Sequence, residues 1–417
     1  MDLSNIHYSC VDRFLKYVRY DTQSSETSDT FPSSLKQLVL GEELVRELLA
    51  MGLSDAAMDQ HGYVMATIPA TTDKTTVPVI GFIAHMDTSP EVSGENVNPV
   101  LHQNYDGKDI VLPGDPSIVI TVEDNPDLRG KNGETIITSD GTTLLGADNK
   151  SGIAEILDAA QHLLAHPEIP HGTIRICITP DEEVGQGTKY FDVQKFGCSY
   201  AYTIDGEHLG SIENETFCAD SMTIVFRGVN IHPGFAKGKM VNSIKIAASF
   251  IDMLQKDGLS PETTEAKQGY VHPYVLNGGI EETSVKFLLR SFEVDELREQ
   301  EAYLRRLADR AVAMYPKASV EFKVEESYRN MRFILDQHPE VLEVARLAME
   351  TLGIKPEFGS IRGGTDGARL SYMGLPCPNI FAGEHSFHSK REWISVQDMQ
   401  KAVQTIIAIS NFWEKRS

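Results

Sequence analysis

The chain has 417 residues, and because domains usually hold about 100–200 residues, two domains are expected. Hydrophobic residues make up 41% of it and charged residues 24%, a balance that excludes wholesale disorder and predicts a globular protein with a sizeable core. Lys and Arg number 38 against 60 Asp and Glu, a formal net charge of −22. This acidity argues against nucleic acid or an anionic membrane surface as a partner.

The first residues and the cysteines indicate in which compartment the protein is expected. Residues 1–20 lack a basic start and an unbroken apolar run, so they are not expected to be a signal peptide. No stretch approaches the ~18 apolar residues that a membrane-spanning helix needs. The five cysteines form no CxxC pair, which indicates neither a disulfide framework nor a cysteine zinc site. A reducing cytoplasm is the expected location.

The first half of the chain alternates between helical and strand-like patterns. Apolar residues at helical spacing predict helices, and short apolar runs bounded by Pro, Gly and Thr predict strands. The expected helices cover 11–18, 34–51 and 150–165, and the expected strands cover 62–68, 77–83, 173–179 and 201–204. Residues 89–143 are rich in Pro, Gly, Asn and Asp, and we expect a long, functional excursion with a few short strands. The alternation predicts an α/β sheet.

The pattern changes near residue 216. The next expected elements are strand 219–228, helix 242–256, strands 270–276 and 281–290, helix 293–314 and strand 318–326. This βαββαβ order is typical of a small, ferredoxin-like α+β domain. After residue 328 the α/β pattern resumes, with helix 338–352, a Gly-rich loop at 359–367 and helix 396–414. We therefore expect one α/β domain, residues 1–215 and 329–417, interrupted by an inserted domain at 216–328.

Several short segments place His, Asp or Glu where strands should end. His85 and Asp87 follow an apolar strand; side chains two apart share a face of a strand, so Asp87 is placed to orient the ring of a ligating His85. The alternative is an ordinary polar strand end. Asp148 lies between an extended segment and a helix, where it either bridges two metals or caps the helix, and capping is the commoner role.

A second apolar strand runs directly into Asp181, Glu182 and Glu183. Consecutive carboxylates repel each other unless a cation or solvent screens them. One glutamate could bind a metal while its neighbour takes a proton from water, as general-base catalysis requires. The alternative is a solvated acidic turn.

The remaining candidates are Asp205, which ends another apolar strand, and the pair His385 and His388 in a Gly/Ser turn, of which one is expected to be a ligand. Nitrogen and oxygen ligands without cysteine suit zinc, with manganese or cobalt as substitutes. Asp148, Glu183 and Asp205 contribute −3 against +4 for two ions, so a bridging hydroxide would bring neutrality. Two metals about 3.5–4 Å apart can share that hydroxide as a nucleophile and polarise a carbonyl. The pattern predicts a dinuclear hydrolase.

Seven segments carry a resemblance to a known family. They are GFIAHMDTSP, TLLGADNKSGIAEI, ITPDEEVGQGTKYFDV, AYTIDGE, NIHPGFAKGKMVNS, IRGGTDGARLSYMGLPCPN and FHSKREW. They closely resemble the tripeptide aminopeptidases of the co-catalytic dinuclear zinc exopeptidase superfamily, over nearly the whole chain. The resemblance implies a mixed-sheet catalytic domain with an inserted lid and dimerisation domain. It also implies release of the N-terminal residue of tripeptides by attack of a water that bridges two zinc ions.

The resemblance also implies roles for particular residues. The implied metal ligands are His85, Asp148, Glu183, Asp205 and His388. Asp148 would bridge the two zinc ions, with His85 and Asp205 on one ion and Glu183 and His388 on the other. Glu182 would be the general base, and Asp87 would lie behind His85.

In the inserted domain, His232 of the NIHPG segment resembles a residue that steadies the tetrahedral oxyanion. In several relatives this histidine reaches the partner subunit's site, so a homodimer is expected. Asn242, Arg290 and Arg362 resemble positions that contact the short peptide substrate. The planar fork of an arginine suits the terminal carboxylate of a peptide, although a surface salt bridge is the competing interpretation for Arg290.

The chain departs from the family pattern at three places. Asn149 follows the bridging aspartate where the family usually has Asp. Glu207 and His208 stand in a stretch that tends to be glycine-rich, and Glu384 and His385 stand where glycine and aromatic residues are more usual. None of these removes a predicted ligand, and we expect them to retune the pocket that measures substrate length.

Two other functions compete with the peptidase hypothesis. The same metal set serves dipeptidases and deacylases of N-acyl amino acids. A catalytically silent peptide-binding module is the other alternative, since a fold alone does not establish an activity. Every predicted ligand and the predicted base are present in the sequence, which favours an enzyme.

Overall fold

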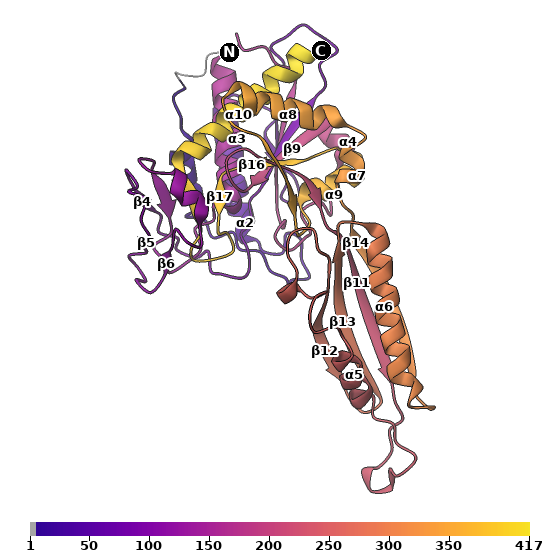
Figure 1. Cartoon of the computed structure of the whole chain (residues 1–417). Helices are drawn as coiled ribbons and strands as arrows, with labels where there is room; N and C mark the ends of the chain where they lie inside the picture. Colours follow the sequence, from indigo (N-terminus) through magenta and orange to yellow (C-terminus); the bar gives the residue numbers. More distant parts are fainter. Residues whose placement is uncertain (1–5) are drawn as a thin grey trace. The chain divides into compact units, whose positions relative to one another are not determined.

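The computed structural model describes residues 6–417 and divides the chain into two units (Figure 1). The first unit takes the chain up to Asn214, then Met331–Gly359 and Thr365–Ser417, and the second takes Glu215–Asn330 and Ser360–Gly364. Residues 1–5, part of the segment 1–20 that was expected not to be a signal peptide, lie outside the described residues. Each unit is described by itself below.

The first unit contains an eight-stranded mixed sheet. In spatial order its strands are β1 (Ala57–Met58), β2 (Val64–Ile68), β8 (Ile174–Thr179), β3 (Ile80–His85), β9 (Tyr200–Gly206), β16 (Asn379–Phe381), β10 (Ser211–Thr216) and β15 (Glu357–Ile361). Strands β8, β3, β9 and β16 run parallel, whereas β1–β2, β2–β8 and β10–β16 pair antiparallel. The prediction of an α/β fold with a mixed sheet is confirmed.

The central strands are mostly apolar because both faces of the sheet are covered. All six residues of β3 are buried, as expected for a parallel strand between two layers. Phe82 and Tyr202 stack on one another with ring centroids 5.8 Å apart, while Ile83, Cys177 and Ala201 belong to a separate apolar cluster. In the register of β3 with β8, His85 stands opposite Thr179, so both strands finish at the same edge.

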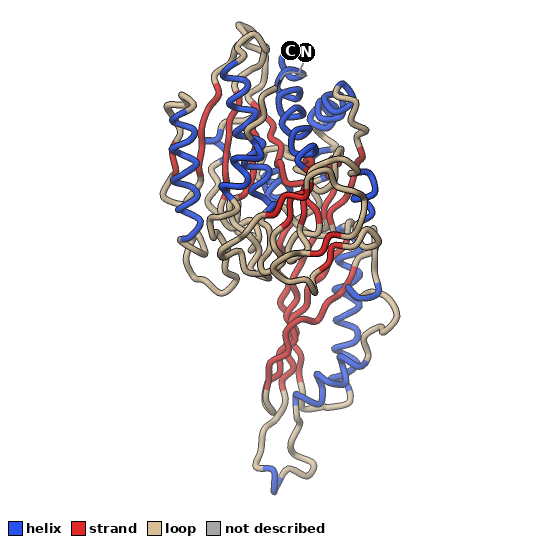
Figure 2. The backbone as a smooth tube through the Cα atoms, turned by 90° about the vertical axis from the view of Figure 1, so that its left-hand side faces the viewer, coloured by secondary structure: helices blue, strands red, loops and turns tan. Residues whose placement is uncertain are grey.

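Helices cover this sheet (Figure 2). They are α1 (Cys10–Tyr17), α2 (Lys36–Ala50), α3 (Ala147–Ala165), α4 (Val193–Phe196), α7 (Arg332–Leu335), α8 (Pro339–Thr351), α9 (Asp366–Tyr372) and α10 (Val396–Arg416). Helix α3 packs against β3 and β9 and also contacts α1 and α10. Within residues 6–417, no helix combines the length and the apolarity needed to cross a bilayer.

The excursion at 89–143 forms small sheets of its own. Strands β4 (Val100–His102) and β7 (Ile136–Thr138) pair with each other and, through β18 (Trp393–Ser395), with β17 (Glu384–His385). Strands β5 (Ile110–Val111) and β6 (Val119–Ile120) form a separate pair, and a short 3-10 helix covers Pro126–Gly130. Trp393 lies buried in the apolar cluster of this region. The excursion is thereby joined to the C-terminal segment that carries His388.

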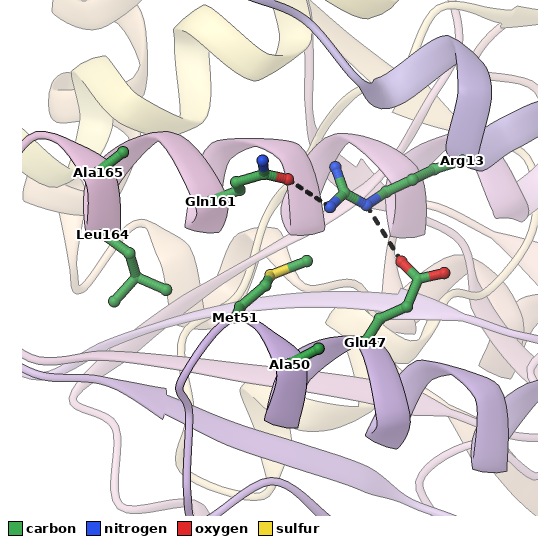
Figure 3. A pocket seen from close by; sticks show the side chains of 7 residues that line it. All are labelled: Arg13, Glu47, Ala50, Met51, Gln161, Leu164 and Ala165. Atoms are coloured by element: carbon green, nitrogen blue, oxygen red, sulfur yellow. Dashed lines mark hydrogen bonds and ion pairs between the residues drawn. The ribbon is translucent and has the colours of Figure 1, made fainter.

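An open hollow of about 550 Å³ lies between α1, α2 and α3 (Figure 3). It is lined by Arg13, Glu47, Ala50, Met51, Gln161, Leu164 and Ala165. The guanidinium of Arg13 donates to Glu47 Oε2 over 3.2 Å and to Gln161 Oε1 over 2.6 Å. The polar groups of this hollow therefore bind one another, and none of the expected site residues lines it.

The second unit is an antiparallel sheet with helices packed on it. Its strands are β12 (Tyr270–Gly278), β13 (Glu282–Ser291), β11 (Cys218–Arg227) and β14 (Ser319–Tyr328), in that spatial order, and its helices are α5 (Ser243–Asp252) and α6 (Val294–Ala313). Phe226 of β11, Phe250 of α5 and Phe287 of β13 form the centre of the layer between sheet and helices. Along the chain these elements run βαββαβ.

The Gly-rich segment 359–367 is not a loop throughout. Strand β15 continues to Ile361, and α9 begins at Asp366 with Thr365 as its N-cap. The Thr365 hydroxyl accepts from the backbone N–H of Ala368 over 3.2 Å, which is the usual role of threonine at a helix start. The expectation of a loop was wrong at both ends of the segment. The glycines hid the pattern of the last residues of β15 and of the first residues of α9, because glycine is uncommon within strands and helices.

Candidate metal centre

Three of the expected ligands lie together at one edge of the central sheet. His85 is the last residue of β3, Asp205 is the penultimate residue of β9, and Asp148 lies where the backbone at the start of α3 departs from helical geometry. The Nε2 atom of His85 lies 2.8 Å from Asp148 Oδ1 and 3.3 Å from Asp205 Oδ1. One nitrogen and two carboxylate oxygens thus face a common point, in a group that could hold a metal ion.

A second group of the same composition shares Asp148. Glu183 follows β8, and His388 lies between β17 and β18. The Nε2 atom of His388 lies 2.6 Å from Glu183 Oε2 and 3.2 Å from Asp148 Oδ2. Asp148 therefore turns one oxygen toward His85 and the other toward His388, which is the arrangement of a bridging carboxylate.

The donor atoms of both groups suit divalent cations. Each group offers one imidazole nitrogen and two carboxylates, the borderline and hard ligands that zinc, manganese and cobalt accept. Glu183 Oε1 is buried and has no hydrogen-bond partner among the described residues. A buried carboxylate oxygen without a partner is costly, and a cation would satisfy it. The residues present fit two metal ions.

The electrostatic potential of the cluster also favours cations. Burial alone would lower the pKa of His85, but the carboxylates of Asp205 and Asp148 hold it well above its usual value. In the same way Asp148 and Glu183 outweigh burial and raise the pKa of His388 to about 11. Burial, with Asp148 nearby, raises the pKa of Glu183 to about 8. The crowded carboxylates favour positive charge at this point, and a divalent ion would supply it.

Asp87 shapes the turn that carries the two glutamates. It is fully buried, and its carboxylate oxygens accept the backbone N–H groups of Glu182 over 3.0 Å and Glu183 over 3.1 Å. His85 Nδ1 lies 3.0 Å from the backbone oxygen of Asp87 and 3.3 Å from its Oδ1. The nearest acceptor for the Nδ1–H of His85 is therefore the backbone carbonyl of Asp87, and the carboxylate of Asp87 is slightly farther away.

Glu182 stands beside the metal ligands without belonging to either group. Its Oε1 atom accepts the backbone N–H of Asp366, the first residue of α9, over 3.3 Å. Removal from water raises the pKa of Glu182 well above its usual value, and the positive potential of His85 opposes this. A carboxylate whose proton affinity is raised in this way is suited to proton transfer.

The third carboxylate of the acidic run has a different role. Asp181 is buried and accepts from the backbone N–H of Ser33, from the Ser33 hydroxyl and from Gln37 Nε2, over 2.6, 2.5 and 2.6 Å. It connects the turn after β8 to Ser33, before α2, and to the first turn of α2. Its φ of +56° lies in the left-handed region, where aspartate is more tolerated than most residues.

Of the two histidines in the C-terminal turn, only His388 belongs to the metal-ligand groups. His385 stacks on Trp393 with ring centroids 3.9 Å apart, and burial lowers the pKa of His385 to about 3. A neutral, stacked ring is a packing element. His385 and His388 therefore divide the structural and the candidate ligand roles between them.

The second unit holds the other expected site residues. His232 is exposed, and its Nδ1 atom accepts the backbone N–H of Gly234 over 3.1 Å. Asn242 caps α5, since its side-chain oxygen accepts the backbone N–H of Ile244 over 2.9 Å. Capping is the common role of asparagine at this position, and contact of Asn242 with substrate stays a prediction.

The two arginines that were expected to contact substrate, Arg290 and Arg362, bind backbone carbonyls. Arg290 donates from Nη1 to the carbonyls of Asp220 and Leu289, over 3.3 and 2.9 Å. The guanidinium of Arg362 donates to the carbonyls of Ala266, Gln268 and Thr264 and lies over the ring of Phe217. Arg290 forms no salt bridge among the described residues of the kind that competed with a substrate role. Substrate contacts by either arginine stay predictions.

The residues at which this chain departs from the family pattern lie close to the candidate metal ligands. Asn149 is buried beside Asp148, and its side-chain oxygen accepts the backbone N–H of Gly152 over 3.3 Å. Glu384 is buried, and burial together with Asp148 raises its pKa well above the usual value. Glu207 and His208 follow β9 directly, and His208 Nε2 lies 3.5 Å from a carboxylate oxygen of Glu357.

Sequence reasoning missed two buried residues that hold the ligand-bearing loops. Glu392 accepts the backbone N–H groups of Leu145, Gly146 and Asp148. Asn125, from the long excursion, accepts from the side chains of Ser386 and Trp393. The only signal for Glu392 was its position four residues after His388, and nothing near Asn125 marked it.

Comparison with known proteins places this geometry in a family. The model of peptidase family M20/M25/M40 matches residues 139–411. This chain belongs to that family. Among proteins of the family, Peptidase T of Caldanaerobacter subterraneus is 48% identical over 97% of this chain and 99% of that protein. Peptidase T of Bacillus subtilis is 47% identical over 98% and 99% of the two chains. The resemblance drawn from the seven sequence segments is confirmed.

Solved structures show the M20 fold. The aminopeptidase PepT of Bacillus cereus superposes with a TM-score of 0.74 at 24% identity, covering 97% of this chain and 98% of that one. A dinuclear metal-binding peptidase of the M20 family from Bacillus subtilis superposes with a TM-score of 0.66 at 17% identity, covering 96% of each chain. At these identities the likeness establishes the fold of this M20 chain.

Proposed function

We propose that the protein is a metal-dependent tripeptide aminopeptidase, which releases the N-terminal residue of tripeptides. The observation that carries the proposal is the pair of ligand groups joined by Asp148, with Glu182 beside them. Relatives named Peptidase T that are 46–48% identical over at least 97% of this chain support the substrate class. The substrate is therefore a short peptide with a free amino end.

The proposed cofactors are two zinc ions, with manganese or cobalt as substitutes. His85, Asp148 and Asp205 would hold one ion, and Asp148, Glu183 and His388 would hold the other. Bound metals of this kind supply an acidified water as nucleophile and polarise the scissile carbonyl. Tetrahedral nitrogen and oxygen ligation without cysteine is common at catalytic zinc sites.

Glu182 is the proposed general base. It would take a proton from the attacking water and return it to the leaving amine. Burial raises the pKa of Glu182 and so increases its affinity for that proton. Two backbone contacts hold it in place: its own N–H binds Asp87, and its Oε1 receives the N–H of Asp366. Asp87 supports this role because one carboxylate fixes both the base and the neighbouring ligand, Glu183.

His232 is the proposed oxyanion stabiliser, and the second unit is the proposed lid. Because His232 Nδ1 accepts the N–H of Gly234, the neutral ring carries its proton on Nε2. That nitrogen is then a donor, as stabilisation of a developing oxyanion requires. Closure of a lid over the peptide would exclude water and complete the site.

We also propose a homodimer formed through the second unit. Strand β12 is an outer strand of its sheet, and Tyr274, Val275 and Leu276 on it are exposed. An exposed apolar edge strand is prone to pair with another chain. Analytical ultracentrifugation should give about twice the chain mass of 46.2 kDa, and a monomer at micromolar concentration would contradict the dimer.

A cytoplasmic location completes the proposal. All five cysteines are free, and four of them are buried. Burial raises the pKa of Cys177 and of Cys377 well above the usual value, so these thiols are unreactive packing groups. Free, unpaired thiols are typical of proteins in a reducing compartment.

A peptide panel tests the proposed activity. Purified, zinc-loaded protein is incubated with Met-Gly, Met-Gly-Gly, Met-Gly-Gly-Gly and N-acetylmethionine, and free methionine is followed with and without a chelator. Chelator-sensitive release mainly from the tripeptide is expected. Release mainly from N-acetylmethionine would identify a deacylase, and release mainly from Met-Gly a dipeptidase. Silence on all four compounds would favour the binding-module alternative.

A further inference from the structure

The carboxylate of Glu392 binds the backbone of the segment that carries the bridging aspartate. Its Oε2 atom accepts the N–H groups of Leu145 over 2.7 Å and Gly146 over 2.8 Å, and its Oε1 atom accepts the N–H of Asp148 itself over 3.0 Å. Glu392 is 1% exposed. Three charge-assisted hydrogen bonds inside the protein make this a strong anchor.

An ionised carboxylate is the side chain that suits this position. It only accepts hydrogen bonds and has two oxygens, whereas an amide of the same shape would turn an NH₂ group toward at least one N–H donor. The buried ammonium of Lys150 lies near enough to attract Glu392 electrostatically, and it donates to the carbonyl of Tyr20 over 2.8 Å. Burial raises the pKa of Glu392 to about 7, and the three backbone N–H groups that it accepts oppose this rise. The anchor therefore depends on two acceptor oxygens placed against three N–H donors.

Glu392 also connects the two ligand-bearing loops. It lies four residues after His388 and directly before β18, whose Trp393 pairs with Thr138 of β7. The same short segment thus presents His388 from one end and holds the backbone of Asp148 from the other. A shift of either loop would change the spacing between the two oxygens of Asp148 and their histidine neighbours.

We propose that Glu392 is a positioning residue for the metal centre. It fixes the backbone of Asp148 so that Oδ1 meets His85 while Oδ2 meets His388, which is the geometry that lets one carboxylate serve two ions. This inference rests on the metal centre of the proposed function. It adds a residue that touches neither substrate nor metal and acts through Asp148.

The test compares metal binding by Glu392→Gln, Glu392→Asp and a matched control, Glu155→Gln. Glu155 is a fully buried glutamate of α3, the helix at whose start Asp148 lies. Among the described residues it makes no hydrogen bond to the loops that carry the ligands. Affinities for Zn²⁺ and Co²⁺ are measured by competition with a chromophoric chelator, and the visible absorption of bound Co²⁺ reports the ligand geometry. Circular dichroism of each metal-free variant checks the fold.

We expect Glu392→Gln to weaken metal binding about 10–100-fold, the usual effect of removing a residue that orients a ligand, and to change the Co²⁺ spectrum. Glu392→Asp keeps the charge, so it should weaken binding less. Glu155→Gln should stay within about twofold of the wild type. A folded Glu392→Gln variant that binds both ions with wild-type affinity and spectrum would overturn the proposal. So would loss of fold in both Glu392 variants, because Glu392 would then be a folding residue.

Metal binding is measured without a peptide, so failure of this inference is separable from failure of the proposed function. A wild-type chain that binds two ions but cleaves no peptide leaves the positioning role open to the same comparison, and the affinities decide it. A wild-type chain that binds no divalent ion overturns the metal centre and this inference together.

Discussion

At the scale of single residues, the centre depends on how two neighbouring glutamates are used differently. Glu183 points its Oε2 toward His388, whereas Glu182 Oε1 receives a backbone N–H from α9. Both carboxylates come from one turn, and Asp87 fixes both through their N–H groups. Adjacent residues in a turn thereby acquire separate tasks, one as a candidate ligand and one as a candidate base.

The division of tasks predicts the effect of Glu182→Gln. The variant should lose at least about 100-fold in kcat, because positioned general acid–base catalysis contributes about 10²–10⁴-fold. Metal content should stay at the wild-type level, since Glu182 belongs to neither ligand group. Steady-state rates on a tripeptide and metal analysis of the same sample check both expectations. Wild-type turnover by this variant would remove Glu182 as the base.

Glu155 predicts a pH-dependent stability. It is fully buried without a hydrogen-bond partner among the described residues, and burial, with Asp398 and Asp158 nearby, raises its pKa well above the usual value. The folded state therefore binds this proton more tightly than the unfolded state. Protonated Glu155 makes its full contribution to the free energy of unfolding below the pKa of a glutamate in the unfolded chain, about 4.3. That contribution is lost as pH rises toward the pKa of Glu155 in the folded protein.

Glutamine at position 155 cannot ionise, so Glu155→Gln should gain stability relative to the wild type as pH rises. Urea unfolding of the metal-free proteins at pH 5, 6, 7 and 8 measures the difference in unfolding free energy. The difference should grow steadily from pH 5 to 8. A difference that is constant over this range, or that shrinks, would show that Glu155 ionises normally in the folded protein.

At the scale of elements, the excursion at 89–143 has a structural task. Its strands β4 and β7 join β18 and β17 in one sheet, and its Asn125 Oδ1 accepts from the Ser386 hydroxyl over 2.6 Å and from Trp393 Nε1 over 3.0 Å. The turn that presents His388 therefore rests on a segment more than 250 residues earlier in the chain.

Asn125→Ala should lower the unfolding free energy by about 1–3 kcal/mol, because the buried indole N–H of Trp393 would lose its acceptor. Asn98→Ala, at an exposed position of the same excursion, is the control and should change stability by less than about 0.5 kcal/mol. Urea denaturation of the three proteins makes the comparison. Equal losses for both variants would contradict an anchoring role for Asn125.

The elements that could be predicted are those with long, uniform patterns. The buried strand β3 appeared as an apolar run, and β8 as an apolar run interrupted by Arg175. The antiparallel strands and helices of the second unit followed from their periodicity. The short strands β4, β5, β17 and β18 have two or three residues each, too few to show a period. Helix α9 was missed because it follows two glycines and starts at a threonine cap.

At the scale of the whole molecule, the site joins segments that are far apart in sequence. His85, Glu183 and Asp205 could be predicted because polar residues at the ends of parallel strands meet at one edge. Whether Asp148 caps or bridges, and whether His385 or His388 is the ligand candidate, could not be decided. Those answers depend on loop conformations that distant residues such as Glu392 and Asn125 hold.

The most direct test of the account is the metal dependence of tripeptide cleavage. Metal-free protein is titrated with Zn²⁺ from zero to three equivalents per chain, and the initial rate of methionine release from Met-Gly-Gly is measured at each step. The account predicts no release without metal and a rate that reaches its plateau at two equivalents. Release from the metal-free protein, or a plateau at one equivalent, would contradict a hydrolase built on two ions that share Asp148.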